Sequence, residues 1–237
     1  MFSRKLLSAA LVGAALIAAP ASAAQLTNPT TTSQLVTNGG GLRLRALATT
    51  GDQEAYLGRH DLGSPAGRVG QNLVWNQNGA NNFSLSFDAG TDTLSAVINS
   101  NPTLNFGNFL AGLNANAAGQ AFNMLQIQLR DGGVGAGTLS LSNLMLNGAA
   151  LTPSALAATE GQLTYWGVYG DFKQSFTLTG TLNLAGTFPT SSELNRVEFL
   201  VGSQAVPEPA TWAMMIGGFG MIGGAMRRRA KVNVAFA

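Results

Sequence analysis

Few residues of this chain have the type and spacing that catalysis or metal binding requires. His60 is the single histidine among 237 residues, and there is no cysteine. Zinc prefers nitrogen and sulfur ligands, so one histidine does not make a zinc site. Asp61 follows His60, but no Gly-x-Ser-x-Gly sequence supplies the nucleophile of a serine hydrolase. The sequence therefore predicts a solvated loop histidine, no metal site, no cofactor and no catalytic triad.

The carboxylates form no evident acid–base pair. Glycosidases place two carboxylates about 5–10 Å apart, and the sequence leaves one distant pair open, Asp88 with Glu160. Asp88 and Asp92 flank a turn and could offer oxygen ligands to calcium. The loop motif Asp-x-Asx-x-Asx-Gly is missing, however. Ordinary turn formation is the favoured interpretation of these two aspartates.

The most aromatic stretch of the body is Tyr165-Trp166-Gly167-Val168-Tyr169. Because side chains alternate along a strand, Trp166 is expected on one face and Tyr165 and Tyr169 on the other. The favoured interpretation puts Trp166 in the core and lets the tyrosines cover an edge. The alternative is that Tyr165 and Tyr169 form a platform on which a sugar ring stacks, since tyrosine combines an apolar ring with a polar tip.

Alternation of apolar and polar residues predicts the strands that carry these side chains. It is clear at residues 42–46, where leucines alternate with Arg43 and Arg45, and at 83–87 and 93–98, which a turn joins into a hairpin. Further strands are predicted at residues 125–130, 138–146, 176–184 and 197–201. Short strands separated by Gly and Asn predict an all-β ectodomain with an antiparallel β-sandwich or jelly-roll fold.

The charge of the body differs from the charge of the whole chain. The chain has a net charge of +2, but residues 24–206 carry seven Lys or Arg and ten Asp or Glu, a net charge of −3. No basic patch stands out in this composition, so nucleic acid is excluded as a partner. The lack of cysteine also excludes disulfides as the source of stability.

The C-terminal thirty residues have three parts in a fixed order. Pro207-Glu208-Pro209 comes first, then the uncharged run 210–226, then Arg227, Arg228 and Arg229. A helix of about 17–25 apolar residues spans a bilayer, and Lys and Arg resist translocation. The sequence therefore predicts one transmembrane helix at 210–226, a basic stop-transfer signal in the arginines, and a cytoplasmic tail at 227–237.

The N-terminus predicts export. Arg4 and Lys5 precede an apolar run at 6–19, and Ala21-Ser22-Ala23 has the small-x-small pattern of a signal-peptidase site at Ala21 and Ala23. The expected partners are the Sec machinery and signal peptidase. Cleavage after Ala23 and a later stop-transfer segment give a type I topology, with the body outside the inner membrane.

The C-terminal segment resembles the PEP-CTERM sorting signal of Gram-negative bacteria, in its variant with Trp-Ala after the prolines. The matching residues are Pro207, Glu208, Pro209, Trp212, Ala213, Arg227, Arg228 and Arg229. The resemblance covers about an eighth of the chain. It implies a membrane-bound exosortase as partner, cleavage near the Pro-Glu-Pro motif, and a chain that is membrane-anchored only until it reaches the cell surface or the extracellular space.

These observations divide the chain and favour one function. The predicted parts are a signal peptide at 1–23, a loose N-terminal segment at 24–41, a β-sandwich at 42–202, a linker at 203–209, the transmembrane helix at 210–226 and the tail at 227–237. The favoured function is non-enzymatic, in the cell surface or extracellular matrix, with exopolysaccharide as a further partner that the resemblance suggests. The alternative is a carbohydrate-binding or glycan-hydrolysing module displayed by the same signal.

Overall fold

Two β-sheets and one helix make up the described parts of the computed structural model, which are residues 24–35, 37–46, 54–59, 67–112, 121–133, 137–188, 195–204 and 209–228. The strands are β1 (Ala24–Gln25), β2 (Thr37–Arg45), β3 (Ala55–Arg59), β4 (Arg68–Gln71), β5 (Ala80–Asp88), β6 (Thr93–Ile98), β7 (Leu104–Gly107), β8 (Met124–Arg130), β9 (Thr138–Leu146), β10 (Ala149–Thr152), β11 (Leu156–Ala157), β12 (Leu163–Tyr169), β13 (Phe176–Ala185) and β14 (Arg196–Ser203). The helix is α2 (Pro209–Arg228).

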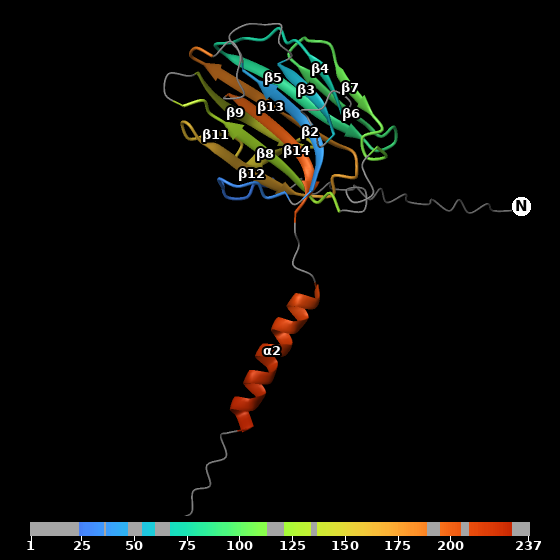
Figure 1. The fold of residues 1–237 in the computed structure, drawn as a ribbon, viewed down its shortest axis with the longest axis vertical. Coiled ribbons are helices and arrows are strands. Elements are labelled where there is room, and N and C mark those ends of the chain that lie inside the picture. The colour runs from blue at the N-terminus through green and yellow to red at the C-terminus, as the bar shows by residue number, and fades with distance from the viewer. Residues whose placement is uncertain are drawn as a thin grey trace, which may run out of the picture.

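The strands form two sheets that face each other (Figure 1). The larger sheet has the order β1-β10-β9-β13-β5-β6-β7, with β11 also paired to β9, and the smaller sheet has the order β12-β8-β14-β2-β3-β4. Neighbouring strands run antiparallel, except that β1 and β10 are parallel. The expectation of an all-β fold with two packed sheets is confirmed.

The core lies between the sheets and follows the alternation of the strands. β5 turns Phe83, Leu85 and Phe87 inward, and its intervening residues face outward. Phe83 meets Phe199 of β14 with a ring-centroid distance of 4.7 Å, which joins the two sheets directly. Burying one such side chain contributes roughly 1.5–3 kcal/mol. The buried apolar residues form one continuous cluster that reaches from β2 to β14.

The N-terminal segment differs from the loose chain expected at 24–41. β1 pairs with β10 of the larger sheet, while Leu26 and Thr30 form bridges to β12 of the smaller one. β2 starts at Thr37, five residues before the predicted boundary, because glycine permits close packing there. A Cβ atom at Gly41 would clash with the carbonyl oxygen of Phe199, and Gly40 has φ +128°. The segment thus closes one edge of the sandwich.

The helix α2 stands apart from the two sheets (Figure 1). It includes the predicted helical range 210–226. Among the residues that the structure describes, no helix has both the length and the apolar character needed to cross a membrane. The transmembrane prediction for 210–226 is therefore not confirmed. The predicted signal peptide at 1–23, with Ala21 and Ala23, lies outside the described residues.

Candidate functional sites

The outer face of the smaller sheet collects most of the cations of the body. Five of the seven Lys and Arg residues between 24 and 206 lie there, and we call this surface the arginine face: Arg43, Arg45, Arg68, Arg130 and Arg196. The strand register places Arg196 of β14 directly between Arg130 of β8 and Arg45 of β2. Like charges that lie directly opposite each other destabilise a sheet, so this row requires compensation.

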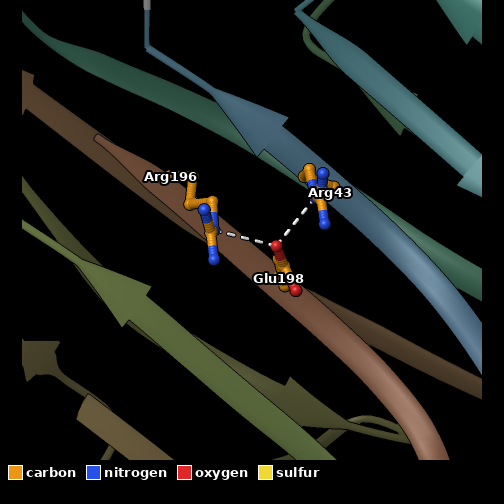
Figure 2. A network of polar contacts seen from close by, with 3 residues as sticks. All are labelled: Arg43, Arg196 and Glu198. Atoms are coloured by element: carbon orange, nitrogen blue, oxygen red, sulfur yellow. Dashed lines mark ion pairs between the residues drawn. The ribbon is translucent and has the colours of Figure 1, made fainter. Parts of the chain in front are cut away.

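Glu198 supplies part of that compensation from the middle of the face (Figure 2). Its Oε1 lies 2.7 Å from Nε of Arg43 and 2.9 Å from Nε of Arg196. The Glu198 side chain is 5% exposed, whereas the side chains of Arg43 and Arg196 are 20% and 17% exposed. Neither contact has the direction of a good hydrogen bond, so the pairing is mainly between charges. A carboxylate this deeply buried depends on both cations.

Tyr56 holds two further arginines of the face in place. The Cζ atom of Arg68 lies 4.1 Å from the centre of the Tyr56 ring, and that of Arg45 lies 4.9 Å from it. Arg45 also donates a hydrogen bond from Nη2 to the Tyr56 hydroxyl at 2.9 Å. Cation–π contacts of this kind contribute about 0.5–2 kcal/mol. The ring is buried beneath the guanidinium groups, which restricts how they can turn.

Tyr165 and Gln128 continue the same face toward β12. The register sets Tyr165 opposite Gln128, and Gln128 opposite Glu198. Burial raises the pKa of the Tyr165 hydroxyl, the Glu198 carboxylate raises it further, and Arg196 lowers it. Tyr165 therefore remains a neutral hydroxyl at neutral pH. The Nε2 atom of the buried Gln128 has no hydrogen-bond partner within the described part of the chain.

Part of the C-terminal signal lies within α2. The helix begins at Pro209, as the fixed φ of proline favours at a first helical position. Trp212, Ala213, Arg227 and Arg228 all fall within it. The other predicted signal residues lie outside the described residues, namely Pro207, Glu208 and Arg229.

Large apolar side chains of α2 are exposed along its length. They include Met214, Ile216, Phe219, Met221 and Ile222, each more than half accessible. Elsewhere in the described residues, exposed apolar side chains of this size are scattered. Exposed apolar side chains are therefore concentrated on α2 within the described residues.

A comparison with known families identifies this segment. Residues 205–229 match the family model for the PEP-CTERM protein-sorting motif. The chain carries a PEP-CTERM sorting signal. The resemblance drawn from the sequence is thereby confirmed, and the signal supports exosortase-dependent sorting of an exported protein to the surface of a Gram-negative cell. A comparison of the whole chain with curated proteins found no match.

The two tyrosines considered as a glycan platform, Tyr165 and Tyr169, differ in their exposure to solvent. Both Tyr165 and Tyr169 point away from the core, on the side opposite Trp166, which is buried in the core. Tyr165 is only 9% exposed, whereas Tyr169 is 57% exposed. Their partners on β8 are Gln128 and Met124 respectively. The two rings therefore do not present one shared open platform.

The aspartates considered for calcium both hold the backbone of turns. Asp88 accepts hydrogen bonds from the Gly90 amide at 2.8 Å and the Thr91 hydroxyl at 2.9 Å. The Gly90 bond is the main cause of the lowered pKa of Asp88. Asp92 accepts from the amides of Leu110 and Ala111 at 2.7 and 2.9 Å. In the described ranges no group of three or more His, Cys, Asp or Glu could hold a metal ion.

The remaining residues considered for hydrolysis are the pair Asp88 and Glu160 and the neighbours His60 and Asp61. Glu160 is exposed in the turn before β12, and Asp88 is the exposed last residue of β5. His60 and Asp61 lie outside the described residues.

Sequence reasoning missed the arginine face, although its signal was visible. Arg43 and Arg45 alternate with leucines, and Arg196 and Glu198 alternate with Val197 and Phe199. Alternation alone puts each pair on one side of its strand. What it could not give was the pairing of β8, β14 and β2, which brings the separate pairs side by side. A count of charges over the whole body hides such a concentration.

Proposed function

We propose that this protein is a non-enzymatic β-sandwich that an exosortase releases from its C-terminal segment and leaves at the cell surface or in the extracellular matrix. The match of residues 205–229 to the sorting motif carries the proposal. Export through the Sec machinery, with signal peptidase cutting after Ala23, precedes this step. Its support is that Ala24, the next residue, already begins β1 and pairs with Leu151.

The position of the motif suits removal of α2 without damage to the sandwich. Gln204, just after β14, donates its amide to Oδ1 of Asn123 at 2.8 Å, and Nδ2 of Asn123 donates to the Gln204 carbonyl at 3.4 Å. Every strand that the structure describes thus precedes the motif. Since a residue spans at most about 3.6 Å, the enzyme acts within roughly 20 Å of the sandwich.

The exposed apolar side chains of α2 are the second support. Removing apolar surface from water is favourable by roughly 25 cal/mol per Å², so α2 is more stable when these side chains are covered. We infer that the exosortase and the surrounding lipid cover α2 before cleavage, and that this contact holds the chain at the membrane until then. A Cβ atom added at Gly220 or Gly224 would meet nothing within 4 Å, so the helix offers a smooth approach there.

Intact mass and cell fractionation test the proposal in a host that has the exosortase. We compare the wild type with Pro207→Ala/Glu208→Ala/Pro209→Ala, and use Glu160→Ala as a control that removes an exposed carboxylate elsewhere. We expect the wild type and the control to lack α2 and to leave the inner membrane. The triple variant should keep α2 and stay there. Retention of residues 227–237 by the wild type, or equal processing of the triple variant, would refute the proposal.

A further inference from the structure

We propose that the outer face of the larger sheet binds a neutral, extended polysaccharide outside the cell. The proposal concerns the sandwich alone and does not depend on how the C-terminal signal is processed. The site, which we call the neutral face, consists of the outward side chains of five adjacent strands, β9, β13, β5, β6 and β7. It extends along β13 from Thr177 to Asn183.

The strand register aligns short polar side chains in rows across the neutral face. The second row sets Ser84 of β5 opposite Thr179 of β13. Leu85 and Leu178 lie between this row and the first one, and they point into the core, so both rows point outward. The first row crosses four strands and contains Asn105, Ser95, Ser86 and Thr177.

The lack of charge on the neutral face favours an uncharged ligand. About a quarter to a third of the residues on an ordinary protein surface are Lys, Arg, Asp or Glu, whereas the described outward residues in the rows from Thr177 to Asn183 include none. Asp88 stands beyond the first row, where its carboxylate accepts the Gly90 amide. Covering a charged group costs far more free energy than covering a hydroxyl whose hydrogen bond the ligand replaces. A ligand rich in hydroxyl groups meets this condition.

The hydroxyl groups in the middle of the face are available to a ligand. The side chains of four residues make no hydrogen bond within the described part of the chain, namely Ser84, Ser86, Thr177 and Thr179. Thr177 is exposed and the other three are half-buried. A hydroxyl group both donates and accepts, and the hydroxyls of a sugar do the same, so the two can pair in either direction.

Other side chains of the face are held in place by hydrogen bonds between strands. Oγ of Ser95 donates to Oδ1 of Asn105 at 2.8 Å, and Nδ2 of Asn183 donates to Oγ of Ser142 at 2.9 Å. Threonine is stiff about χ1, so Thr177 is also restricted. Ordering these side chains on binding therefore costs little, which favours affinity for a ligand that matches them.

The size of the neutral face favours a polymer chain over a second copy of this protein. Five strands about 4.8 Å apart give a width of roughly 20 Å, and the six steps from Thr177 to Asn183 give a length of roughly 20 Å. The face therefore has an area of roughly 400 Å², about half of what each partner of a stable protein pair buries. A polysaccharide chain is narrow, and several of its sugar rings fit along one row.

Isothermal titration calorimetry of the full chain in mild detergent tests the proposal. The probes are glucomannan and cellohexaose, which are neutral and extended, and the anionic polymer polygalacturonate. The variants are Thr177→Val/Thr179→Val, which removes two hydroxyls at constant shape, and Ser84→Lys, which puts a long charged side chain in the middle of the face. Thr159→Val is the matched control, because Thr159 is exposed in the segment before β12 of the other sheet. Circular dichroism checks folding, and sedimentation velocity measures self-association.

We expect glucomannan and cellohexaose to bind with an affinity that added salt does not change, since no charge is involved. The affinity should fall about tenfold in the double variant, at least tenfold in Ser84→Lys, and less than twofold in Thr159→Val. Failure of both neutral probes to bind would overturn the proposal. So would tighter binding of polygalacturonate, equal weakening by Thr159→Val, or a dimer that Ser84→Lys alone dissociates. If Ser84→Lys does not fold, the double variant decides.

Discussion

Replacing Glu198 by glutamine probes how far one carboxylate holds the arginine face together. The change keeps the size of the side chain but removes the charge that lies 2.7 Å from Arg43 and 2.9 Å from Arg196. Removing one partner of a fully buried ion pair costs about 3–5 kcal/mol, and exposed pairs contribute at most about 1 kcal/mol. Glu198 is buried and its partners are about one-fifth exposed, so we expect Glu198→Gln to lose about 2–3 kcal/mol of unfolding free energy.

Urea unfolding followed by circular dichroism measures this loss, and thermal unfolding should show a midpoint lower by about 4–12 °C. A double-mutant cycle with Arg43→Gln isolates the pair. Because the single carboxylate serves two cations, the double variant should be less destabilised than the sum of the single variants. A loss below about 0.5 kcal/mol, the range of ordinary surface substitutions, would refute the reasoning. Strict additivity would refute it as well.

Three further predictions use the same measurements on other parts of the sandwich. Phe199→Ala removes the contact with Phe83 between the sheets and should cost about 3–5 kcal/mol in urea unfolding. Gly41→Ala should prevent folding, seen as loss of the sheet signal in circular dichroism, because its Cβ meets backbone; Gly107→Ala, which meets nothing within 4 Å, should change stability by less than about 1 kcal/mol. Because burial raises the pKa of Tyr165, the folded state keeps its proton when the unfolded state releases it. The unfolding free energy should therefore fall as pH rises above about 10, and this fall should be smaller in Tyr165→Phe.

Strands in which apolar and polar residues alternate could be predicted from the sequence. The hairpin predicted at 83–87 and 93–98 is β5 with β6, and the strand predicted at 138–146 is β9, because apolar and polar residues alternate in each. β3 was missed because its first four residues are all buried, so no alternation marks it. Tyr56 in that strand is apolar in pattern yet faces outward, where arginines cover it.

The sorting signal and the arginine face differ in how their residues are distributed along the sequence. The sorting signal is contiguous, so its residues could be recognised in the sequence alone and matched as one segment at 205–229. The arginine face is assembled from β2, β4, β8 and β14 and exists only after the sheet has formed its register. Slipping β14 by one residue would turn Arg196 and Glu198 into the core and Val197 outward. The burial of Phe199 and Val197 therefore fixes which charged side chains lie together on the opposite side of the sheet.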